Sequence, residues 1–287
     1  MEWWIWAGFA LGLFLLSIPV SWWLIKIAPR RAEGKGDWVS DNAEVTTSEV
    51  AGRSVTIRNV RDFTWRTSRD HDVRWSDETF DLDDLTGQYY IVEYIHKVRA
   101  LAHTMLTFEF RDGRRLTCSF EVRRQQGQKF HPWTGLWRSF ELIQIWGMER
   151  DVLFLRTNVR RNETYLFPCA TLPHKREAMF LGLLARTNEL AGKPEFYHTL
   201  TKSCTTALIR EANRVTPGKV PFNLGALAPG YSIRPAMKYE IIQDLGGLER
   251  TKQLARIDIL ASELESPVGY SEAIRAEMKD HFTHPSS

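Results

Sequence analysis

The chain has few cysteines and little net charge. Its three cysteines, Cys118, Cys169 and Cys204, are odd in number and show no CxxC spacing, so neither a disulfide framework nor a thiolate metal site is expected. A net charge of +3 over 287 residues falls short of the basic footprint of a nucleic-acid-binding protein. We therefore expect no nucleic-acid partner.

Common cofactor and catalytic motifs are also missing. The sequence contains no GxSxG nucleophile elbow, no phosphate-binding Walker loop and no GxGxxG dinucleotide fingerprint. Its histidines form no HxH or HxxxH cluster of the kind that binds zinc; they are His71, His96, His103, His131, His174, His198, His281 and His284. We expect neither a metal ion nor another cofactor.

Tryptophan, in contrast, is abundant at the N-terminus. Residues 3–27 carry no charge before Lys26, and about 20 apolar residues suffice for a helix to cross a bilayer. Tryptophans flank this stretch as interfacial residues do; they are Trp3, Trp4, Trp6, Trp22 and Trp23. We predict a membrane anchor over 1–28. A cleaved signal peptide is the alternative, but it requires a basic start, and Glu2 is the only charged side chain there.

The orientation of this anchor follows a different signal. Lys26, Arg30, Arg31 and Lys35 lie at or just after its end. The positive-inside rule keeps such a flank in the cytoplasm, so by this signal alone the body of the protein is cytoplasmic.

The remaining sequence predicts an α+β domain. We expect a loose polar tether over 29–50, a folded core over 51–215 and a helical and loop extension over 216–287 packed on that core. Strand patterns occur at 55–65, 89–94, 140–146, 152–157 and 163–167. Helical patterns occur at 174–190, after Ser203 to about 215, at 237–260 with a break at Gly246-Gly247, and at 271–282.

The strongest local pattern is a hairpin. The alternating runs 103–110 and 116–123 flank a turn that contains Asp112-Gly113, which is typical of paired antiparallel strands. One face carries an apolar core and the other is polar. With a loop of three residues, His103 and Glu121 on the polar face would be neighbours across the strands, where a carboxylate fixes the imidazole tautomer. The alternative is a histidine that titrates on an exposed face.

Cys204 is the candidate nucleophile. Ser203 is a suitable N-cap, which places Cys204 in the first turn of a helix, where unpaired N–H groups and the helix dipole lower a thiol pKa. The alternative is a buried thiol that acts as a small apolar side chain, which is the interpretation we keep for Cys118 and Cys169. Six arginines form either a solvated face or a site for lipid phosphate; they are Arg123, Arg124, Arg138, Arg156, Arg160 and Arg161.

Several segments, in this order, resemble the Lnb N-terminal periplasmic domain family of lipoprotein N-acyltransferases. They are RNVRDF at 58–63, AHTMLTFEF at 102–110, SFEVRR at 119–124, FEL at 140–142, ERDVLFLRTN at 149–158 and PEFYHTLTKSCTT at 194–206. With LAPGYS and YSEAIR in the tail, the resemblance covers about residues 37 to 277.

This resemblance implies a permuted papain-like, NlpC/P60-related fold in which a strand histidine precedes a cysteine on a helix. Cys204 would then accept an acyl group as a thioester, His103 would transfer the proton, and Glu121 would orient the ring. Tyr197, Ser203 and Arg123 would support the site. The family usually has Asn where this chain has Ser203, which leaves the role of that side chain open.

The resemblance also implies a periplasmic body on a single-pass anchor in the bacterial inner membrane, against the positive-inside signal, and a lipid or lipoprotein substrate. We choose the periplasm. The leading hypothesis is a cysteine-dependent acyltransferase or acyl hydrolase. The alternatives are an NlpC/P60-like peptidoglycan peptidase or amidase and a non-enzymatic binding module. An apolar channel beside Cys204 would favour a lipid substrate, and a polar open groove would favour a peptide substrate. A Cys204 side chain buried away from His103 would favour the binding module.

Overall fold

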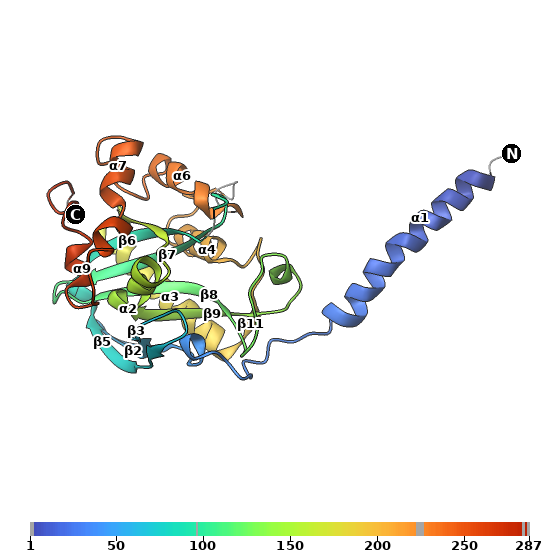
Figure 1. Cartoon of the computed structure of the whole chain (residues 1–287), viewed down its shortest axis with the longest axis horizontal. Coiled ribbons are helices and arrows are strands. Elements are labelled where there is room, and N and C mark those ends of the chain that lie inside the picture. The colour runs from blue at the N-terminus through green and yellow to red at the C-terminus, as the bar shows by residue number, and fades with distance from the viewer. Residues whose placement is uncertain (1–2, 96, 222–226, 283–284, 286–287) are drawn as a thin grey trace.

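An apolar N-terminal helix stands apart from the body of the protein. The computed structural model describes residues 3–95, 97–221, 227–282 and 285, so His96 and His284 lie outside the described part. Helix α1 (Trp3–Trp22) continues into a π-helical turn, η1 (Trp23–Ile27), and projects away from the other elements (Figure 1). It is long and apolar enough to cross a membrane. Its large side chains are exposed, which suits a lipid surrounding rather than water.

The body is built on one large sheet. Its strand order is β1-β2-β9-β8-β7-β6-β10, with β5 paired to β2 and β11 paired to β9. Every pairing is antiparallel except the contact of β2 with β9. The strands are β1 (Thr47–Ala51), β2 (Ser54–Arg61), β5 (Trp75–Asp81), β6 (Leu85–Tyr94), β7 (Ala102–Phe110), β8 (Arg115–Arg123), β9 (Glu141–Met148), β10 (Glu163–Pro168) and β11 (Glu195–Phe196). The predicted α+β class is confirmed.

The hairpin of β7 and β8 is confirmed with its three-residue loop. The Phe110 N–H donates to the Arg114 carbonyl at 3.0 Å, and Gly113 has a φ of +86° that L-residues rarely adopt. Leu106 pairs with Cys118. Continued along the strands, this register places His103 opposite Glu121.

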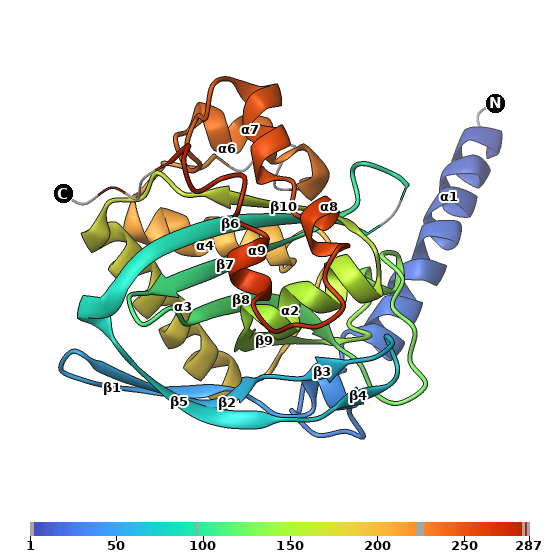
Figure 2. The ribbon, with the colours of Figure 1, turned by 60° about the vertical axis from the view of Figure 1, so that its left-hand side comes forward.

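Helices cover both faces of the sheet (Figure 2). One face packs against α3 (Pro173–Gly192) and α4 (Cys204–Val215), the other against α2 (Glu149–Phe154), α8 (Asp258–Ala261) and α9 (Tyr270–Ala273). Helix α7 (Leu248–Ala255) contacts β10, and α6 (Ile233–Lys238) follows the turn η6 (Pro229–Tyr231), which contacts β6 and β7. The face expected to be polar is therefore a second interior: Met105, Thr107 and Thr117 are fully buried. The C-terminal extension provides this cover.

Four secondary-structure predictions were wrong in whole or in part. Residues 152–157 form α2 and the π-helical turn η5 (Leu155–Val159) instead of a strand, because a short, fully buried apolar run has no period that separates the two. The break predicted at Gly246-Gly247 is confirmed, since both glycines have a positive φ, but the helical pattern at 237–260 is divided among three short helices, α6, α7 and α8. The last helix ends at Ala273. The strand expected at 55–65 is interrupted after Arg61, before β3 (Thr64–Trp65), which pairs with β4 (His71–Asp72).

The loose tether expected at 29–50 is instead largely attached to the body. Trp38 forms a β-bridge with Gln125, and the buried Asn42 side chain donates to the Val122 carbonyl at 3.0 Å. Residues of this segment thus form hydrogen bonds with backbone groups at the end of β8 rather than with water. Strand β1 also begins within the range assigned to the tether.

Candidate active site

Cys204 is the first residue of α4. The Ser203 hydroxyl accepts the Thr206 N–H, and the Thr206 hydroxyl in turn accepts the Ser203 N–H, so the two residues form a capping box. The predicted N-cap is thus confirmed. The first turn is buried, with Cys204 7% exposed, because the apolar side of α4 packs on the sheet. The cap therefore fixes the thiol at the positive end of a 12-residue helix.

The hairpin opens where it meets this helix end. Ladder pairs of β7 with β8 run from Glu109–Arg115 to Leu106–Cys118 and stop short of His103. Thr104 lies in this opening, where its backbone N–H and its hydroxyl both stabilise the Cys204 thiolate. The Thr104 hydroxyl also lies 2.9 Å from that of Thr205. The separated strands thus supply donors that a continuous ladder would have used.

His103 links the thiol to a carboxylate. Its Nε2 lies 2.7 Å from Ser119 Oγ and 3.2 Å from Glu121 Oε1, and the Ser119 hydroxyl donates to the same carboxylate at 2.7 Å. His103 also interacts electrostatically with Cys204, because the thiolate favours the protonated ring and raises its pKa. The predicted proximity of His103 and Glu121 is confirmed, and the structure brings Cys204 to the same pair.

A buried arginine fixes this carboxylate. Arg156 Nη2 donates to Glu121 Oε1 at 2.6 Å, and its Nε donates to Glu93 Oε2 at 2.9 Å. Arg156 lies in the π-helical turn η5, a feature common at functional sites. Glu93 also accepts a hydrogen bond from Asn162 at 2.7 Å. The Glu121 carboxylate that orients His103 is therefore itself fixed by Arg156, which Glu93 holds in place.

The charges at the site favour a thiolate–imidazolium pair. Burial raises the pKa of the Cys204 thiol, but His103 and the Thr104 donors outweigh burial and lower the pKa to about 7. Burial likewise opposes protonation of His103, yet Glu121 and Cys204 raise its pKa to about 10. Between these two values Cys204 is ionised and His103 is protonated, as a nucleophile with an adjacent acid requires.

The thiols of the other two cysteines have raised rather than lowered pKa values. Burial raises the pKa of Cys118, and it raises the pKa of Cys169 to about 12. Both are buried and unpaired, in line with the expectation that they act as small apolar side chains. Cys204 alone among the three has the low pKa of a reactive thiol.

Alkylation should report this pairing. We expect iodoacetamide to modify Cys204 at a rate that rises with pH through about 7, since the thiolate forms above its pKa. In His103→Ala, burial remains while the cation is lost, so the midpoint should move above the ordinary thiol value of about 8.5. Intact mass across a pH series measures both profiles. Identical midpoints would mean that His103 does not stabilise the thiolate.

The supporting residues divide into two groups. The thiolate of Cys204 adds to burial in raising the pKa of Tyr197, which places this hydroxyl in the electrostatic range of the site. Arg123 instead bonds the carbonyls of Asn42 and Ala43 at 3.1 and 2.6 Å. The geometry therefore ties Arg123 to the segment before β1 rather than to Cys204.

Most of the six arginines have partners within the protein. Arg124 pairs with Asp41, and Arg138 donates to the Ala28 carbonyl. Arg160 and Arg161 are the two of the six whose side chains show no hydrogen bond or ion pair to another described residue. A solvated or phosphate-binding role thus stays open for these two.

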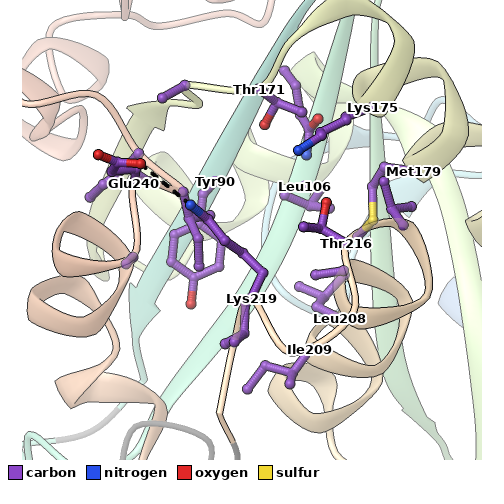
Figure 3. Close-up of a pocket in the computed structure, with 18 of the residues that line it drawn as sticks. Tyr90, Leu106, Thr171, Lys175, Met179, Leu208, Ile209, Thr216, Lys219 and Glu240 are labelled. Atoms are coloured by element: carbon purple, nitrogen blue, oxygen red, sulfur yellow. Dashed lines mark hydrogen bonds and ion pairs between the residues drawn. The ribbon is translucent and has the colours of Figure 1, made fainter.

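An apolar cavity lies along the helix that Cys204 begins. It has a volume of about 670 Å³, within the usual range for ligand pockets, and follows α4 between α3, α6 and the sheet. Figure 3 shows Leu208 and Ile209 of α4 facing Tyr90 and Leu106 of the sheet. Its lining includes Thr205, the residue after Cys204, and Lys219, which pairs with Glu240 at 3.4 Å, but none of Cys204, His103 and Glu121. A more polar cavity of about 1,140 Å³ beside α2 and α8 includes none of Cys204, His103 and Glu121.

Sequence reasoning missed part of the site. Ser119 shares the face of Glu121 at a spacing of two, so the strand period could have identified it. Thr104 owes its role to the opened hairpin, and Glu93, which is the partner of His103 across β6 and β7, is joined to Glu121 by Arg156 of the misassigned segment. No group of three or more metal-ligating side chains occurs in the described ranges.

Comparison with known proteins identifies a family for this chain. The Lnb N-terminal periplasmic domain family matches residues 71–235, a range that contains His103, Glu121 and Cys204. No curated protein and no solved structure matches. Because the match extends over more than half of the chain, this protein belongs to the Lnb N-terminal periplasmic domain family.

Proposed function

We propose that this protein is a cysteine-dependent acyltransferase, or acyl hydrolase, that acts on lipid or lipoprotein acyl esters. What carries the proposal is the placement of Cys204 at the capped start of α4, within electrostatic range of His103, whose ring lies 3.2 Å from Glu121. The histidine preceding the cysteine in the chain is the order of a permuted papain-like fold. A periplasmic domain family and an N-terminal candidate span support a site at the periplasmic surface of the inner membrane.

The proposed reaction has two balanced steps. The Cys204 thiolate attacks the ester carbonyl, and the departing alkoxide takes a proton from the His103 imidazolium, which leaves a thioester and a neutral imidazole. An acceptor amine, or water, then attacks the thioester while His103 takes its proton, and the thiolate leaves. The original protonation state is restored.

The cavity along α4 supports a lipid substrate. It is lined mainly by apolar side chains, including Met179, Ala212, Val215 and Ile242, and its lining includes Thr205, the residue after the nucleophile. Burying an aliphatic chain there gains about 0.8 kcal/mol per methylene. The electrostatic interaction of Cys204 with His103, which lowers the pKa of the thiol, also counts against a binding module in which the two lie apart.

Filling the cavity should select against long chains. Ala212→Trp is expected to lower thioester formation from a long-chain donor by roughly tenfold, the worth of about two buried methylenes, and to leave an acetyl donor unaffected. Arg210→Trp, which adds the same ring at an exposed position of α4 outside the cavity, is the matched control. Equal losses of thioester formation with the long-chain and the acetyl donor would show that the cavity does not bind the acyl chain.

A competition between substrate classes tests the proposal. The full chain is incubated with phospholipid vesicles, diacyl lipopeptides or peptidoglycan fragments, and the products are analysed by mass spectrometry beside those of Cys204→Ala. The proposal predicts lysolipid or lyso-lipopeptide, with acylated amine where a transferase acts. Cys204-dependent cleavage of peptidoglycan alone would instead establish the peptidase.

A further inference from the structure

A loop of the body is fastened to the end of the anchor. We name residues 130–139 the Trp133 loop. The rings of Trp137 and Trp22 lie 5.9 Å apart at their centroids, and Arg138 Nη1 donates to the Ala28 carbonyl at 2.7 Å. Arg30 Nη1 returns a hydrogen bond to the Trp137 carbonyl at 3.2 Å. These contacts hold the loop at the level of the tryptophans that end the candidate span.

The same loop supports the segment that leads to the nucleophile. The Thr199 hydroxyl donates to the Pro132 carbonyl at 2.7 Å, and the rings of Phe130 and Tyr197 lie 5.7 Å apart. A Cβ at Gly135 would lie 2.5 Å from Thr199 Oγ1, so the two segments touch through a glycine. Ser203, the N-cap of the Cys204 helix, follows this segment in the chain. The Trp133 loop thus joins the anchor to the Cys204 helix.

The loop also presents apolar side chains outward. Trp133 is 62% exposed and stacks edge-on with Trp137 at 5.6 Å. Leu200, in the adjoining segment, is 45% exposed. Arg31 and Lys35 are exposed on the chain that follows the anchor. An aromatic ring flanked by cations is the composition that the headgroup region of a bilayer accepts.

We infer that Trp133, Trp137 and Leu200 form a second membrane contact, which rests on the bilayer that holds α1. The occupant is the lipid headgroup layer, because the loop is continuous with the interfacial end of the anchor through Trp22 and Arg30. This contact sets the entrance to Cys204 at the membrane surface. It extends the proposed function by fixing where the thiol meets lipid, but the contact itself does not depend on catalysis.

Quenching by brominated lipid tests the contact directly. The full chain is reconstituted in vesicles that contain phosphatidylglycerol, with and without brominated acyl chains. The emission of Trp133 is the difference between wild type and Trp133→Phe. We expect bromine to quench this difference at least twofold. The emission of the fully buried Trp146, obtained in the same way from Trp146→Phe, should be unaffected. Equal Trp133 emission in both vesicles would overturn the inference.

A second arm separates this inference from the proposed function. Trp133→Asp should lower thioester formation from vesicle lipid several-fold and leave the alkylation of Cys204 by iodoacetamide unchanged. Val268→Asp, at an apolar residue that is 84% exposed in the C-terminal extension, is the matched control. A quenched Trp133 in a chain that forms no thioester would support the membrane contact and refute the proposed chemistry.

Discussion

Replacing His103 with alanine is expected to slow thioester formation by about 10²- to 10⁴-fold, the usual contribution of a positioned acid–base residue. Two losses combine: the thiol is no longer ionised near neutral pH, and the leaving alkoxide has no proton donor. Single-turnover acylation, followed by intact mass, measures the rate.

Glu121→Gln is the informative comparison for this substitution. It keeps a hydrogen-bonding group at 3.2 Å from Nε2 but removes the charge that raises the pKa of His103. The profile of acylation against pH should therefore lose its alkaline limb at a lower pH, because the imidazolium now titrates earlier. An unchanged rate in His103→Ala, with the fold intact, would mean that another group moves the proton.

Removing the Arg156 side chain should lower the free energy of unfolding more than the loss of an exposed ion pair does. This side chain is 3% exposed and pairs with Glu93, 1% exposed, and with Glu121. Arg156→Met would leave the buried Glu93 carboxylate, and the partly exposed Glu121, without their cation, and breaking a buried pair typically costs about 3–5 kcal/mol of unfolding free energy. Denaturant unfolding of the chain measures the difference.

Arg58→Met provides the control for a lost ion pair. Arg58 pairs with Glu49 and Asp77 at 3.4 and 3.5 Å, with about half of its side chain exposed, so solvent screens the loss and little change is expected. If both variants unfolded alike, the Arg156 network would not stabilise the carboxylate that orients His103.

The local parts of the site could be predicted from the sequence because local rules determine them. The period of two in the hairpin placed His103 and Glu121 on one face, and the Asp-Gly turn gave the register. The preference of serine for the N-cap placed Cys204 at the start of α4. Each rule needs only a few neighbouring residues.

The remaining parts depend on contacts between distant segments. Residues 149–159 form helical turns because α8 and α9 cover them, and nothing in their own apolar pattern shows that cover. The tether is attached because residues near Asn42 satisfy the end of β8. The meeting of Cys204 with His103 needs the opened hairpin around Thr104, which no pattern in β7 or β8 reveals.

The most direct test of the central claim is the intact mass of the full chain after incubation with membrane lipid extract, for wild type, Cys204→Ser, His103→Ala and Cys118→Ser. The account predicts one fatty-acyl mass, released by neutral hydroxylamine, on wild type and Cys118→Ser and on neither of the other two. An adduct that persists in Cys204→Ser, or none on wild type although iodoacetamide modifies Cys204, would contradict it.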